Sequence, residues 1–600
     1  MMKIRRKHIL ILLLLLLPIC LLGISNYFFA ASSYQFTVDT ITNERTGRYW
    51  EPDIDGVLYA LVMCAGVIVL WIPAVYFGWL DKLTEKLSNR ITNCKEYIKE
   101  NKKKILLQIS IIVSIALAAL AVDLIYSLFS PRLLGQGVRR IIFFASVGFS
   151  LYSIIIFRSK PEKLFFSISM IIGTMYVLTH PMLFFGFDNE MHYAWAVEES
   201  YIANVSVLQS DLTLARTFQT GYFGWLPSGE DNAVVYSFQK GSDTLTWVGF
   251  TDARTLYSRI AHIYMGIVMF IGRSVALHPN IVLWMVMLSG HLLYTVVVYF
   301  AIKRLSSGKY LMAAIAMAPL TFLISTTLGN DHWMKAFILL GFAYCFYEIQ
   351  NPDKKLTLKN TIIMIGAFLV GLSPKAIYFP IMIILYCIRK NKFKTEKEYR
   401  WYLLSVTGAI VFVLSTLFVP YLLTGGTGYE DSRGVGHINS PEQIMFILQN
   451  PLVYTGVLLN FMRDYLNLFY NERLVTWYIS YGHTSFPNLA MLLIMFTALT
   501  DRCESDKFTS TVKQRLFMAL ILFSTISLFI TAMYIGFTEV GSLSIEGVQK
   551  RYLIPLLFPF FYVICSFNIE NRINKTTYSS LVFGISSLIL LNGAWRTFIP

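Results

Sequence analysis

The stretch ILILLLLLLPICLL at residues 9–22 contains no charged side chain, and comparable apolar runs recur at 105–121 and 576–595. An apolar run of about 20 residues is long enough to cross the hydrocarbon core of a bilayer as a helix. Over the whole chain, 55% of residues are hydrophobic and 14% are charged, against about 45–50% and about 25% in soluble proteins. We therefore expect an all-α polytopic membrane protein.

The basic residues are distributed unevenly, and their distribution predicts an orientation. The formal net charge is +15, but Lys and Arg gather in short segments between apolar runs, so we expect no nucleic-acid partner. With the N-terminus inside, the inner segments hold 33 of the 51 basic residues, as the positive-inside rule predicts. The working surface is therefore expected on the outer side. The seven cysteines fall in expected spans or inner loops, where no extracellular disulfide would form.

Apolar runs and their interruptions predict about 13–15 membrane spans. They are expected at 9–30, 57–79, 105–129, 140–157, 164–185, 281–302, 310–328, 333–350, 360–372, 376–388, 401–423, 485–500, 516–537, 552–567 and 576–595. The first of these also resembles a cleavable signal peptide, but its apolar run continues to Phe29, beyond a typical signal core.

Some segments are expected to depart from uniform spans. Segment 257–275 is apolar, but a full crossing there would invert the later topology, so we expect a helix at the outer interface or only partly inserted. Segment 360–388 is interrupted by SPK at 373–375 and predicts a broken or re-entrant hairpin. Long folded outer loops are expected at 186–280 and 424–484, the second with helical periodicity over 441–473.

Polar residues that could carry chemistry follow the span ending near residue 185. The sequence PMLFFGFDNEMHYAWA at 181–196 places Asp188, Glu190 and His192 just beyond the apolar run. If a helix begins at Asp188, this residue and His192 share one face. A helix cap at a membrane boundary, with an interfacial histidine, is the alternative explanation.

A second acid and several cations are expected at the same depth. Asp331 and His332 lie in a short turn between two spans, and Lys375 and Arg551 lie beside proline-containing span starts. Charges next to irregular backbone in a membrane usually face a polar cavity. Snorkelling to the interface is the alternative for the cations, and the more natural one for Lys550.

Several short motifs resemble, in their order, a bacterial family catalogued as domain of unknown function 2142, which in turn resembles the GT-C glycosyltransferases. The similarity extends over roughly 160–570, so we expect extra N-terminal helices at 1–158, a catalytic core at 159–570 and a last helix at 571–600. The motif residues are Asp188, His192, Ser325, Thr326, Thr327, Asp331, Lys375, Tyr378, Pro380, Pro441, Glu442, Gln443, Asn450, Pro451, Gln549, Arg551, Tyr552 and Pro555.

This resemblance implies a GT-C-like helical bundle in the bacterial cytoplasmic membrane, with its active face outside. It implies transfer of a sugar from a polyprenyl-phosphate donor to a cell-envelope glycan or another acceptor, with inversion expected. Asp188 would be the base, and Asp331 would position the acceptor or a metal. The residues implied to hold or orient the substrate and lipid phosphate are His192, Lys375, Gln549, Arg551 and Tyr552.

The chain departs from the family pattern at one catalytic position, because Asn189 follows Asp188 where an acid is common. Glu190 is displaced by one residue, so either carboxylate is a candidate base. Metal dependence stays open, with Asp188 and Asp331 as candidate ligands. A lipid-linked oligosaccharide flippase or transporter and a polysaccharide polymerase or ligase are the alternatives. A flippase is less favoured because charges are mostly absent from mid-span.

Overall fold

The computed structural model describes the chain in a series of segments. They are residues 6–28, 34–38, 45–50, 54–76, 78–129, 136–179, 189–200, 206–208, 247–249, 256–274, 279–423, 438–466, 477–478, 482–483, 488–501, 511–565, 569 and 571–599. Asp188, the candidate base, lies outside these described residues.

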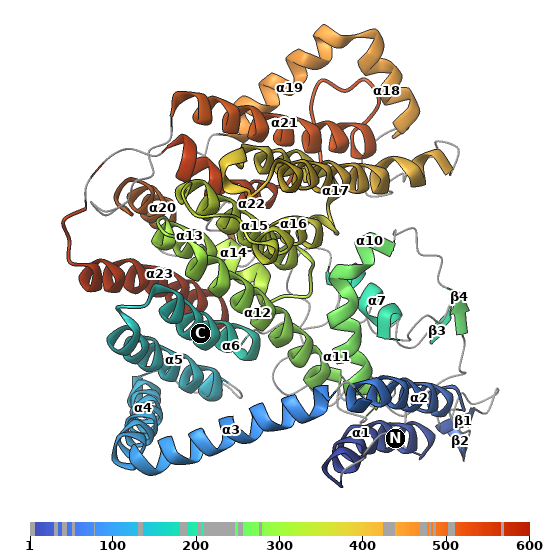
Figure 1. Ribbon diagram of the computed structural model, residues 1–600, viewed down its shortest axis with the longest axis vertical. Coiled ribbons are helices and arrows are strands. Elements are labelled where there is room, and N and C mark those ends of the chain that lie inside the picture. The colour runs from blue at the N-terminus through green and yellow to red at the C-terminus, as the bar shows by residue number, and fades with distance from the viewer. Residues whose placement is uncertain are drawn as a thin grey trace.

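The architecture is a helical bundle, as Figure 1 shows. The N-terminal helices are α1 (Arg6–Phe28), α2 (Ile54–Tyr76), α3 (Trp79–Glu100), α4 (Lys102–Phe129), α5 (Gln136–Phe157) and α6 (Pro161–Thr179). The middle of the chain forms α7 (Asn189–Ser200), α10 (Leu256–Arg259), η2 (Ile260–His262), α11 (Ile263–Ser274), α12 (Pro279–Arg304), α13 (Lys309–Ala316), α14 (Pro319–Ser325), α15 (Asp331–Gln350) and α16 (Leu358–Leu372). The remaining elements are η3 (Ala376–Cys387), η4 (Lys390–Lys392), α17 (Glu396–Leu423), α18 (Ser440–Gln449), α19 (Pro451–Tyr465), α20 (Leu489–Thr500), α21 (Val512–Phe537), η6 (Lys550–Leu553), α22 (Ile554–Pro559), η7 (Phe560–Ile564) and α23 (Lys575–Phe598).

Short antiparallel strand pairs accompany the helices in the connecting segments. The pairs are β1 (Tyr34–Val38) with β2 (Arg45–Trp50), β3 (Ser206–Leu208) with β4 (Trp247–Gly249), and β5 (Trp477–Tyr478) with β6 (Gly482–His483). Each sheet has two strands, so the sheets do not alter the helical class of the fold.

The expectation of an all-α polytopic membrane protein is confirmed. Within the described residues, seven helices are long and apolar enough to cross a membrane: α4, α5, α6, α12, α17, α21 and α23. An eighth crossing is present if α18 and α19, which meet at 106°, are counted as one broken span. Helix α4 leaves most of its apolar side chains exposed, as expected of a helix in contact with lipid.

Within the described residues, fewer helices qualify as long apolar spans than the 13–15 expected, in part because several apolar runs are interrupted. The expected span 310–328 divides into α13 and α14 before Pro319, and the expected span 552–567 divides into η6, α22 and η7 around Pro555 and Pro559. Proline lacks an amide donor and ends or bends a helix. The interruption expected in 360–388 is confirmed, since α16 ends at Leu372 and η3 begins at Ala376.

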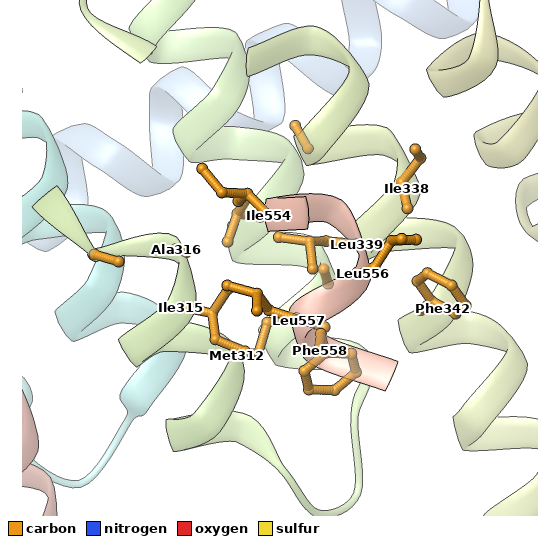
Figure 2. Close-up of a cluster of buried hydrophobic side chains, with 14 of the residues drawn as sticks. Met312, Ile315, Ala316, Ile338, Leu339, Phe342, Ile554, Leu556, Leu557 and Phe558 are labelled. Carbon is orange, nitrogen blue, oxygen red and sulfur yellow. The ribbon is translucent and has the colours of Figure 1, made fainter. Parts of the chain in front are cut away.

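The buried centre of the bundle fixes the short helix α22 between two neighbours. Figure 2 shows apolar side chains of α13, α15 and α22 in one cluster: Met312, Ile315, Ala316, Ile338, Leu339, Phe342, Ile554, Leu556, Leu557 and Phe558. Inside a bilayer such close packing, rather than exclusion of water, favours helix association. Because η6 directly precedes α22, this cluster also fixes where η6 meets α15.

A buried ion-pair network joins the C-terminal end of α15 to its neighbours. Glu348 Oε1 lies 2.7 Å from Arg304 Nη2, and Glu348 Oε2 lies 2.8 Å from Lys392 Nζ. Asn360 Nδ2 donates a third hydrogen bond to Glu348 at 2.9 Å. The side chains of Glu348 and Lys392 are each 2% exposed, so the charges compensate one another away from water.

Candidate functional site

Three residues expected at the site from the sequence meet at the N-terminal end of α15. Lys375 Nζ lies 2.6 Å from Asp331 Oδ1, and Arg551 Nε lies 3.1 Å from Asp331 Oδ2. Asp331 and Arg551 are buried, and the Lys375 side chain is 23% exposed. Segments far apart in the sequence therefore place two cations on one carboxylate, and we call Asp331, Lys375 and Arg551 the cation cluster.

The local backbone explains how each member reaches this cluster. Asp331 is the first residue of α15, where a negative charge is stabilised by the helix dipole. Lys375 occupies the break between α16 and η3, so its side chain leaves an irregular backbone segment. Arg551 lies in η6, shortly after Gly547, whose φ of +76° favours glycine and whose added Cβ would lie 2.5 Å from Phe537 Cδ1.

Aromatic residues support the cation cluster from the side of η6. Lys375 Nζ lies 4.5 Å from the centre of the Tyr552 ring, within cation–π range. The Tyr378 hydroxyl donates a 2.8 Å hydrogen bond to the Tyr552 carbonyl, and the Tyr465 hydroxyl donates one of 2.7 Å to the Gln549 carbonyl. Two tyrosines on other elements thus hold the backbone on both sides of Arg551.

The ion pairs determine the charge state of Asp331. Burial alone would raise the pKa of this carboxyl, but the positive charges of Lys375, Arg551 and Lys335 lower it below the ordinary aspartate range. Both carboxylate oxygens are engaged by cations. In this arrangement Asp331 organises the cluster and is a poor proton acceptor.

Lys335 is a member of this neighbourhood that the sequence reasoning missed. It lies one turn after Asp331 on α15, is 1% exposed, and interacts electrostatically with Asp331, Arg551 and Lys375. The signal was present in the sequence DHWMK at 331–335, because residues i and i+4 share a helix face.

A histidine group lies near the N-terminal end of α15. His192 Nδ1 lies 2.9 Å from His262 Nε2, the two rings are stacked, and Trp195 packs edge-on against both. The candidate residue His192 is therefore buried against a second histidine that the sequence had not singled out. Glu190 belongs to the first turn of α7.

His332 connects this histidine group to the start of α15. Its Nε2 lies 2.6 Å from the Tyr264 hydroxyl of α11. A side chain at Gly290 of α12 would place Cβ 2.9 Å from that hydroxyl and 3.0 Å from His332 Nε2, so any larger residue would crowd this hydrogen bond. His192 lies against the turn before α15, because a Cβ at Gly329 would be 3.8 Å from its ring.

The metal hypothesis concerns Asp188 and Asp331 as candidate ligands. Among them, no group of three or more His, Cys, Asp or Glu residues is arranged to hold a metal ion. Asp331, one of the two candidate ligands, is already engaged by Lys375 and Arg551, and the other, Asp188, lies outside the described part of the chain. The metal hypothesis therefore stays a prediction.

The fold and this cluster define a polytopic helical membrane protein with a buried polar centre at one end of its bundle. The protein family described as predicted membrane protein (DUF2142) matches residues 170–559, and the chain belongs to this family. The matched region contains the cation cluster and the histidine group, but not α1 to α5. No curated protein and no solved structure matches the chain.

Proposed function

We propose that the protein is a glycosyltransferase that moves a sugar from a polyprenyl-phosphate donor to a cell-envelope glycan or another acceptor. The reaction would take place at the outer face of the bacterial cytoplasmic membrane. The observation that carries this proposal is the convergence of Lys375 and Arg551 on Asp331 at one end of a membrane bundle.

The chemistry of such a donor suits the cation cluster. When the bond from the sugar to the phosphate breaks, negative charge builds on the phosphate oxygens, and fixed cations stabilise that charge. Arg551 offers a planar guanidinium, which matches phosphate geometry, and Lys375 adds a compact point charge. The ring of Tyr552 beside Lys375 provides an apolar surface near the same phosphate.

The proposed reaction needs a base other than Asp331. In it, the acceptor hydroxyl oxygen attacks the anomeric carbon, its proton passes to a carboxylate, and polyprenyl phosphate leaves with the bonding electron pair. Asp331 is held ionised by cations, which makes it a weak base. We assign the base role to Asp188, and attack opposite the leaving phosphate gives inversion at the anomeric carbon.

The test uses the purified full chain with a polyprenyl-phosphate sugar and measures release of polyprenyl phosphate. Arg551→Gln should lower this release at least about a hundredfold, as expected when a fixed donor to the developing charge is lost. Arg463→Gln is the matched control, because Arg463 is exposed on α19 and is expected to leave the rate unchanged. Asp188→Asn should abolish release while the protein stays folded.

Three results would count against the proposal. If Asp188→Asn released polyprenyl phosphate at the native rate, Asp188 would not be the base. If Arg551→Gln and Arg463→Gln had equal rates, the cation cluster would take no part in the reaction. Transfer of intact donor across vesicles without cleavage would identify a flippase instead. The orientation is tested separately with Glu190→Cys in a background without native cysteines, where an impermeant maleimide should label intact cells.

A further inference from the structure

Lys335 has a buried amine that takes no part in the ion pairs of the cation cluster. Its side-chain nitrogen has no hydrogen-bond partner among the described residues, although the residue is only 1% exposed. An unpaired ammonium in such surroundings is unfavourable by several kcal/mol. Lys335 interacts electrostatically with Asp331, but among the described residues its amine has neither a hydrogen bond nor an ion pair, and this needs another explanation.

Pairing with Asp331 does not provide that explanation. Lys335 and Asp331 share a face of α15, yet the ion pairs of the Asp331 carboxylate are with Lys375 and Arg551. The neighbouring His332 Nδ1 is also buried and lacks a hydrogen-bond partner within the described residues. Two unsatisfied side-chain nitrogens therefore occur together on the first turns of α15, whereas buried polar groups are ordinarily satisfied.

We propose that Lys335 binds the phosphate of the lipid donor directly, with Asp331 acting as the residue that holds Lys375 and Arg551 in place around it. The ligand class is an isoprenyl phosphomonoester or its sugar ester. The lysine offers three N–H donors and the phosphate offers several acceptor oxygens, so one ligand group satisfies the buried amine. This inference rests on the proposed function for the identity of the ligand.

The experiment measures binding to the purified full chain in detergent with three probes: farnesyl phosphate, inorganic phosphate and farnesol. Lys335→Met should weaken farnesyl phosphate binding by about tenfold or more, the effect of losing one charge-assisted hydrogen bond. Farnesol binding should not change. Lys359→Met is the matched control, because Lys359 is exposed in the first turn of α16 and remote from Lys375 at the other end.

A second measurement separates ligand binding from a structural role. Methionine replaces the lysine stem with a similar apolar volume, so the thermal midpoint of Lys335→Met should stay the same or rise. If Lys335 were structural, the midpoint would fall together with binding of all three probes, which would overturn the inference. Lys335→Gln provides a second variant and should retain intermediate affinity because its amide still donates hydrogen bonds.

The outcomes distinguish this inference from the proposed function. Unchanged farnesyl phosphate affinity in Lys335→Met refutes the assignment of Lys335. A normal affinity with a lower rate and a shifted pH profile also refutes it and indicates proton transfer. If farnesyl phosphate binds in a Lys335-dependent manner but no sugar is transferred, the phosphate site stands and the glycosyltransferase proposal fails. Equal competition by inorganic phosphate would show that the lipid chain adds nothing to recognition, which contradicts a lipid ligand.

Discussion

Replacing Asp331 by asparagine tests whether this carboxylate is needed to hold the cation cluster together. The substitution keeps the size of the side chain but removes the charge that Lys375 and Arg551 contact at 2.6 and 3.1 Å. Removing one partner of a buried ion pair typically lowers stability by about 3–5 kcal/mol. Because the Lys375 side chain is 23% exposed and can move toward water, we expect the lower part of that range.

The double variant Asp331→Asn with Lys375→Met makes the prediction specific. Removing the unpaired ammonium should restore about 1–2 kcal/mol, since contacting residues couple by about 0.5–3 kcal/mol. The assay is reversible unfolding in mixed micelles, followed by circular dichroism. Asp353→Asn, at an exposed position, should stay within about 0.5 kcal/mol of the native protein. Additive effects of the two cluster substitutions, or an unchanged stability of Asp331→Asn, would refute the reasoning.

Two further predictions concern the packing of the bundle. Gly173→Ala should reduce the free energy of unfolding by about 3 kcal/mol or more, because the added Cβ would lie 2.0 Å from His291 Nε2. Gly366→Ala is the matched control. A Cβ at Gly366 would have no atom within 4 Å, so this variant should be neutral or more stable by up to about 1 kcal/mol. Thermal unfolding of both variants checks this, and equal behaviour would contradict it. Lys392→Met should destabilise by about 3 kcal/mol by leaving Glu348 less compensated. Its farnesyl phosphate affinity should stay within about twofold, and a larger change would show that the network also shapes the cation cluster.

The sequence predicted the membrane class and much of the cation cluster, because both leave strong local signals. Charges are rare in this chain, so Asp331, Lys375 and Arg551 were conspicuous at the ends of apolar runs. Their expected depth in the bilayer was the same, and the structure shows that they also contact one another. The family range expected from the motifs also agrees with the matched residues 170–559.

The parts that sequence reasoning missed depend on tertiary packing. Lys335 is followed by the apolar run AFILL at 336–340, so it reads as a charge at the start of a membrane span. Its place on the same helix face as Asp331 therefore went unnoticed. His262 lies 70 residues from His192, and a separation of that length carries no periodic signal. Hydropathy likewise could not show that the runs around Pro319 and Pro555 would divide into short helices, because hydropathy does not report backbone hydrogen bonding.

Ion pairs at both ends restrict the relative movement of α15 and the segment 375–392, which contains η3. Both segments run from the cation cluster toward Glu348, and seventeen positions separate the two ion-paired residues on each chain segment, Asp331 from Glu348 and Lys375 from Lys392. If α15 slid along the segment 375–392, both the Lys375–Asp331 and the Lys392–Glu348 ion pairs would break at once. We therefore expect these two segments to move together as one rigid unit.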